Sequence, residues 1–194
     1  MRIGLVAEPW WVNLAVLIPA GAYLFWRRHP VRLAAKQLLV LAIFAAAFGF
    51  LEATVVVYLR AATGLLPGNP PAPETTTAAQ SQLLREIPPN LLRLETFREA
   101  ATMLMLIGAA LLIPEKARSR LAAFLWVFAI WDILYYASLS ATIGWPQSLG
   151  DGDVLFLIPE PWLAPVWFPL LVSALTLLAV LLGRARAKDP IVEY

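Results

Sequence analysis

The segment WDILYY, from Trp131 to Tyr136, places a carboxylate inside a long apolar run of the chain. An aspartate at the centre of a membrane helix costs roughly 2.5–3.5 kcal/mol on insertion scales, so Asp132 must face protein or trapped water instead of lipid. On a helix, Asp132 shares one face with Tyr135 and Tyr136. We therefore expect two hydroxyl groups within reach of this acid.

Other ionisable side chains interrupt the neighbouring apolar runs. Glu52 lies within one of them, and Glu95, Arg98 and Glu99 lie in the first turns of another, where Arg98 can reach back to Glu95 at a spacing of three residues. A helix rises about 1.5 Å per residue, which places Glu52, Glu99 and Asp132 in the halves of their helices nearest the same membrane face. We therefore expect these acids to converge.

Asp153 follows the WDILYY run in a connection on that same face and could fold back toward the acids. The sequence thus predicts a polar pocket near this face, roofed by the segment from Asp153 to Trp162. Its lining residues would be Glu52, Glu95, Arg98, Glu99, Asp132, Tyr135, Tyr136 and Asp153.

Such a pocket has three interpretations. Buried acids can hold helices together through hydrogen bonds from Arg and Tyr, which needs the fewest assumptions. Alternatively, Glu99 and Asp132 could be an acid/base pair, or ligands for a hard cation, in an enzyme acting on a lipid or a small outer-leaflet substrate. Coupled carboxylates could also serve an ion- or proton-coupled permease. No GxSxG, HExxH or Walker A spacing supports a particular reaction, and the sequence assigns no metal site.

The composition is that of an integral membrane protein. Of the 194 residues, 60% are hydrophobic and only 14% are charged, whereas soluble domains carry about a quarter charged residues. Basic residues gather at the ends of the apolar runs, which argues against nucleic acid as a partner. With no Cys and one His, we expect no haem, copper or iron–sulfur ligation by this chain alone. The expected partners are the lipid bilayer and a larger membrane complex or a second copy.

The apolar runs predict an all-α bundle of five transmembrane helices in a single domain over residues 1–194. The expected spans are about 10–26, 37–59, 94–113, 121–143 and 162–182. Residues 60–93 are rich in Pro and Thr and predict a flexible extracytoplasmic loop, with a short interfacial helix near 81–87. The apolar segment 154–158 is too short to cross a bilayer and is closed by prolines, so we expect it to be interfacial or re-entrant.

Two further patterns bear on packing and orientation. Ala45, Gly49 and Ala53 form a small-residue stripe that lets another helix approach closely. Most basic residues fall after the first and third spans and in the C-terminal tail, so the positive-inside rule predicts that the N-terminus is outside and the C-terminus inside. The residues on the predicted inner side are Arg27, Arg28, Arg32, Lys36, Lys116, Arg118, Arg120, Arg184, Arg186 and Lys188.

Four short patterns carry a resemblance: REAAT at 98–102, WDxxYY at 131–136, GWP at 144–146 and DxLFLIPxPW at 153–162. Together they resemble a group of small bacterial multi-span inner-membrane proteins with no established activity. The resemblance covers the second to the fifth expected spans, and its last pattern is the most specific. It implies a bacterial inner-membrane location and no particular reaction. We therefore expect a multi-pass accessory or structural membrane component.

Overall fold

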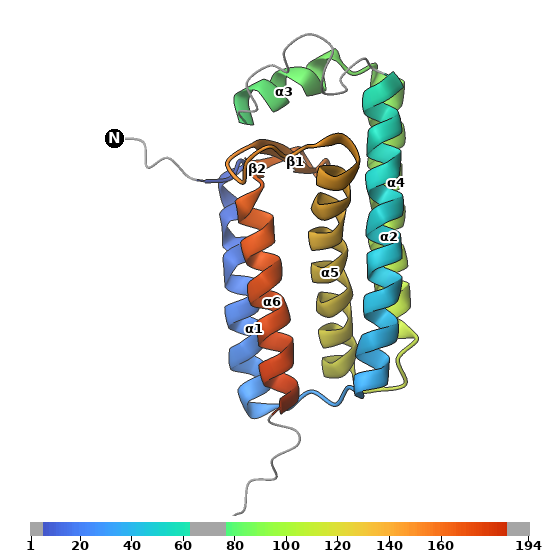
Figure 1. Ribbon diagram of the computed structural model, residues 1–194. Coiled ribbons are helices and arrows are strands. Elements are labelled where there is room, and N and C mark those ends of the chain that lie inside the picture. The colour runs from blue at the N-terminus through green and yellow to red at the C-terminus, as the bar shows by residue number, and fades with distance from the viewer. Residues whose placement is uncertain (1–5, 63–76, 186–194) are drawn as a thin grey trace, which may run out of the picture.

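The computed structural model describes residues 6–62 and 77–185. Its long helices lie side by side, and a small hairpin sits at one end of the bundle beneath a short transverse helix (Figure 1). The elements are the 3-10 helix η1 (Trp10–Val16), α1 (Leu17–Arg28), α2 (Ala35–Ala62), α3 (Thr77–Glu86), α4 (Pro89–Leu111), α5 (Ala117–Ile143), β1 (Gly152–Phe156), β2 (Trp162–Pro165) and α6 (Trp167–Ala185).

Among the described residues, α2, α5 and α6 are the helices that are long and apolar enough to cross a membrane. The expected spans 37–59 and 121–143 correspond to α2 and α5. The charged residues of α4 lower its apolar content, and the change from 3-10 to α geometry divides the first run into two shorter helices. By length and composition, the structure therefore supports three membrane helices of the five predicted.

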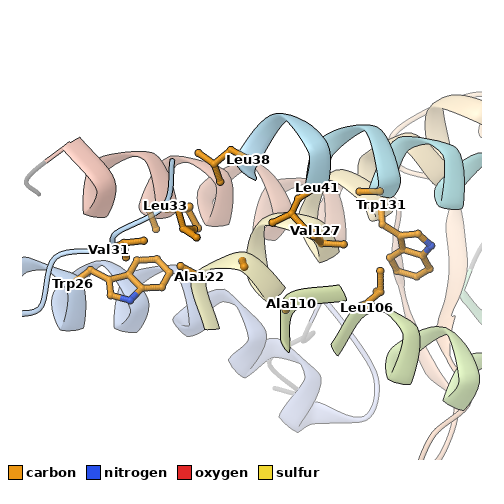
Figure 2. Packing of buried hydrophobic residues seen from close by; sticks show 14 of the residues in the cluster. Trp26, Val31, Leu33, Leu38, Leu41, Leu106, Ala110, Ala122, Val127 and Trp131 are labelled. Carbon is orange, nitrogen blue, oxygen red and sulfur yellow. The ribbon is translucent and has the colours of Figure 1, made fainter. Parts of the chain in front are cut away.

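Helix α5 is the centre of the bundle. It packs against α2, α4 and α6, while α1 packs against α6 on the far side (Figure 1). Buried apolar side chains from these helices form one continuous core, which extends from Trp26 and Val31 at one end to Leu106 and Trp131 toward the hairpin (Figure 2). The helix that carries Asp132 thus contacts three others, which allows its polar residues to find partners on several elements.

The all-α prediction is wrong for the connection between α5 and α6. Residues 152–156 and 162–165 pair as an antiparallel sheet, so the segment expected to be interfacial or re-entrant is mostly a β-strand. The last membrane helix begins at Trp167, after the sheet, and not at residue 162. Prolines around the turn cannot continue a helix, and extended backbone in apolar surroundings must pair its polar groups, which a hairpin achieves.

The segment before η1 adds to this hairpin. Gly152 pairs with Pro165 and Asp153 with Ala164, and on the other edge of β2 the backbone of Glu8 exchanges hydrogen bonds of 2.8 and 2.7 Å with Leu163. The backbone next to the first helix is therefore tied to the connection that leads into the last one.

The predicted flexible loop 60–93 is largely helical where the structure describes it. Helix α2 continues to Ala62, α3 covers 77–86, and α4 begins at Pro89, ahead of the predicted span 94–113; residues 63–76 lie outside the described part. Pro89 suits the first turn of a helix, because its fixed φ is helical and the backbone donor it lacks would have no partner there. The short helix expected near 81–87 is confirmed as α3.

The small-residue stripe on α2 does bring another helix close. Ala45, Gly49 and Ala53 are all buried. A Cβ atom on Gly49 would lie 2.8 Å from the backbone oxygen of Trp131 and 3.2 Å from the nitrogen of Tyr135. The backbones of α2 and α5 therefore meet at the start of the WDILYY segment, and only glycine fits there without a shift of the helices.

Replacing Gly49 with alanine should push α2 away from α5. We expect Gly49→Ala to lower the stability of the detergent-solubilised protein by about 1–3 kcal/mol, the usual cost of overpacking a tight contact. Gly108→Ala is the matched control, because a Cβ there meets nothing within 4 Å and alanine favours the helix. Thermal unfolding of both variants tests this, and equal melting temperatures would contradict the close contact.

Candidate functional site

Glu52, Glu95 and Arg98 form an ion-pair group between α2 and α4. The Arg98 guanidinium donates through Nη1 to Glu52 Oε2, and through Nε to Glu95 Oε2 at 2.7 Å. The second bond confirms the predicted contact between Arg98 and the residue three positions before it. Thr102 Oγ1 donates to the second oxygen of Glu52 at 2.9 Å. Glu52 is only 7% exposed, and both of its carboxylate oxygens have donors. This group links two helices that pack less closely with each other than each does with α5.

Glu99 lies one residue further along α4 but bonds elsewhere. Its Oε2 accepts a hydrogen bond of 2.7 Å from the backbone N–H of Leu157, the residue directly after β1. A carboxylate is well suited to satisfy a backbone donor at the point where a strand ends and its ladder stops. Glu99 therefore connects α4 to the hairpin.

Asp132 does not take its partner from the tyrosines on its own helix. Its Oδ2 accepts a hydrogen bond of 2.8 Å from Ser173 Oγ on α6. The Tyr136 hydroxyl instead donates to Asp153 Oδ2, also at 2.8 Å. The expectation that the tyrosine hydroxyls lie within reach of Asp132 is corrected for Tyr136: the short Ser173 side chain reaches Asp132 from the neighbouring helix, whereas Tyr136 extends to the hairpin.

Asp153 folds back from the hairpin into the bundle, as predicted, and is only 5% exposed. Burial raises the pKa of Asp153 to about 6, and the nearby Arg60 charge and the Tyr136 hydrogen bond act in the opposite direction. The Arg60 guanidinium lies 4.0 Å above the ring of Trp145, a cation–π contact that holds it at this end of the bundle.

Tyr135 is close to charges from both groups of ionisable residues. The charges of Arg98, Arg60, Asp132 and Asp153 all act on it. Its ring stacks on Trp131 with 6.2 Å between the centroids, as the one-turn spacing on the helix predicts. The ionisable residues that the sequence singled out therefore gather around the hairpin half of α5.

This gathering is a set of hydrogen-bonded pairs, and an open carboxylate pocket is not supported. Glu52, Glu95, Glu99, Asp132 and Asp153 each accept a hydrogen bond from a donor of the protein itself. Within residues 6–62 and 77–185, no group of three His, Asp or Glu side chains could hold a metal ion. The hard-cation interpretation therefore gains no support from the structure.

Two indole donors in this region, Nε1 of Trp131 and Nε1 of Trp162, have no hydrogen-bond partner among the described residues. Trp131 is 8% exposed, and among the described residues its indole Nε1 is buried without a hydrogen bond. The Trp131 ring contacts Phe128, Tyr135 and Phe156, with 6.5 Å between its centroid and that of Phe156 on strand β1 of the hairpin. A buried indole N–H usually finds an acceptor, so this atom marks a place that an acceptor from outside the chain would suit.

The sequence reasoning missed three partners of the acids: Ser173, Thr102 and Arg60. Ser173 and Thr176 are buried polar residues in the apolar middle of α6, and a hydroxyl in such a run was the available signal for a partner of Asp132. Thr102 lies one turn after Arg98, on the same face of the helix. The sequence did not indicate Arg60 as a partner, because an arginine directly after an apolar run could equally lie in solvent at the end of the helix.

No protein-family model matches the chain, and no curated protein or solved structure is similar to it. Inferences about function therefore depend on the geometry of the chain itself.

The raised pKa of Asp153 makes stability depend on pH. The folded protein holds the proton up to about pH 6, whereas the unfolded chain releases it near pH 3.8, so stability should fall as the pH rises between these values. The loss attributable to this group is at most about 3 kcal/mol. Asp153→Asn keeps an acceptor for Tyr136 and should remove the part of the pH dependence of stability that this carboxyl group causes. Melting temperatures of both proteins from pH 4 to 7 test this, and parallel curves would contradict it.

Proposed function

We propose that the chain is a multi-pass protein of the bacterial inner membrane and acts as an accessory or structural component of it. The observation that carries this proposal is that the buried acids bond between elements of the fold instead of facing an open site. Glu52 joins α2 to α4, Glu99 joins α4 to the hairpin, Asp132 joins α5 to α6, and Asp153 joins the hairpin to α5. Such bonds make the hairpin end a rigid unit suited to contact with other proteins.

Five spans, with the N-terminus outside and the C-terminus inside, are part of this proposal. Two observations support five crossings. The long helices α1, α2, α4, α5 and α6 lie side by side and alternate in direction along the chain (Figure 1). Large apolar side chains are exposed on α4, among them Phe97, Leu104 and Leu111, as well as on α2, which suits a lipid environment for both helices. The basic residues at the end opposite the hairpin favour that end as the inner one.

The orientation can be tested by single-cysteine labelling, because the chain contains no cysteine of its own. We expect a membrane-impermeant maleimide to label Glu8→Cys, Asn90→Cys and Gly150→Cys in intact cells. Ala34→Cys and Lys116→Cys should react only after permeabilisation. All five positions are exposed at helix ends or in connections. Labelling of Ala34→Cys from outside would contradict a crossing by the first helix, and labelling of Lys116→Cys would contradict a crossing by α4.

The structural role of the acids predicts a loss of stability when an ion pair is broken. Glu52→Gln leaves the half-buried Arg98 with Glu95 alone and should lower stability by about 2 kcal/mol, less than the cost for a fully buried pair because Arg98 is partly exposed. Arg98→Gln should lower stability by a similar amount, and the double variant should lose less stability than the sum of the two single losses. Glu8→Gln, at an exposed position, is the control and should melt like the parent protein.

A membrane-embedded enzyme acting on a lipid or a small substrate is the second candidate. The unpartnered Trp131 N–H favours it, because an acceptor group of a substrate could occupy that position, on a side chain that contacts Phe156 of the hairpin. In this case Glu99 and Asp132 would be the acid/base residues. The same variants separate the two candidates: full stability of Glu52→Gln and Arg98→Gln would remove the main support for the structural role and leave the enzyme as the better candidate.

A further inference from the structure

A surface hollow lies at the end of the bundle opposite the hairpin, at the C-terminus of α1. It has a volume of about 590 Å³ and is lined by Leu24, Phe25, Arg27, Arg28 and His29. The ring of Phe25 lies against that of His29, with 5.0 Å between the centroids. Within the described part of the chain, Arg27 and Arg28 make no ion pair or side-chain hydrogen bond, so their guanidinium groups are available to a ligand.

An apolar stripe on α1 and η1 leads into this hollow. Its members recur at helical spacing on one face and are exposed, with Leu17 60% and Leu24 57% accessible; they are Leu14, Leu17, Ile18, Leu24 and Phe25. Gly21 interrupts the stripe, and a Cβ atom there would meet nothing within 4 Å. The face therefore has a shallow notch in its middle and a basic end, the shape and chemistry that suit an acyl chain attached to an anionic headgroup.

The charge around the hollow is strongly positive. Arg32, Lys36 and Lys116 are exposed at this end of the bundle, and Arg120 and Arg184 donate to backbone carbonyls of Ile113 and Leu33. Among the described residues, the only acid at this end is Glu115. Basic sites next to membrane helices bind the phosphate groups of anionic lipids, and guanidinium groups match phosphate oxygens in a planar, two-point geometry.

We propose that this hollow binds one anionic phospholipid, with its phosphate between Arg27, Arg28 and His29 and an acyl chain along the stripe from Phe25 to Leu14. A free phosphate ion would use the guanidinium groups but leave the stripe and its notch unoccupied, whereas a lipid uses both. The inference rests on the proposed function only in that it needs α1 to lie in the bilayer.

The test is lipid binding to the full-length protein in a neutral detergent, followed by native mass spectrometry. Dioleoyl phosphatidylglycerol should bind more tightly than dioleoyl phosphatidylcholine. Arg27→Gln/Arg28→Gln should weaken the binding of phosphatidylglycerol by about tenfold or more, since each basic residue near a lipid phosphate contributes roughly a factor of five. The matched control is Arg32→Gln/Lys36→Gln, which removes the same charge at the same end but outside the hollow, and it should change binding less than twofold.

A second variant addresses the acyl chain. Gly21→Leu fills the notch from a position where an added Cβ atom meets nothing within 4 Å. It should weaken the binding of the dioleoyl lipid while leaving that of dihexanoyl phosphatidylglycerol unchanged. Equal losses in the two charge variants, equal binding of phosphatidylcholine, or displacement of the lipid by millimolar inorganic phosphate would each overturn the proposal. These outcomes are independent of the cysteine labelling, so a failed lipid site and a failed five-span arrangement give different results.

Discussion

The bonds from Arg98 to Glu52 and Glu95 show the constraint that governs the hairpin half of this protein. Charged groups among apolar helices are stable only when each has a partner of opposite sign or a hydrogen-bond donor, since an unpaired buried charge costs several kcal/mol. Helix α4 packs mainly on α5, so the bonds from Arg98 and Thr102 to Glu52 are the direct polar links that fix α4 with respect to α2. Once α4 is fixed, Glu99 meets the backbone of Leu157 and holds the hairpin in place.

The opposite half of the bundle is held together mainly by apolar packing, and none of the ion pairs among the described residues lies there. Trp26 is fully buried against α6, and a Cβ atom on Gly183 would lie 3.0 Å from its Cβ. The contact between α2 and α5 at Gly49 is of the same kind, a close approach of helices permitted by a missing side chain. Figure 2 shows the apolar residues between these two contacts. Helix α5 belongs to both halves, which explains why its residues 121–131 are apolar and why Asp132, Tyr135 and Tyr136 lie beyond them.

The cost of a buried charge was enough to identify Asp132 and Glu52 from the sequence, because any acid in a long apolar run must face protein. Their partners were harder to predict. Periodicity gives the face of a helix on which Asp132 lies but not which neighbour meets that face, and Ser173 is 41 residues away on another helix. Arg98 and Glu95 were predictable because both lie on one helix. The hairpin was missed because residues 154–158 are continuously apolar, a pattern that does not distinguish a buried strand from a helix segment, and its pairing with Glu8 depends on contacts distant in sequence.

The two ends of the bundle therefore differ in whether their charged side chains are compensated by charges of opposite sign. At the hairpin end, Arg98 and Arg60 lie close to the carboxylates they compensate, so little net charge is left to attract a partner electrostatically. At the other end, Arg27 and Arg28 have no acid to compensate them among the described residues, and the carbonyl end of α1 favours cations there but does not neutralise them. A membrane surface with anionic lipids would lower the energy of that end and leave the hairpin end unaffected. The same asymmetry thus supports both the proposed orientation in the bilayer and the proposed lipid site at α1, without any contribution from the acids at the opposite end.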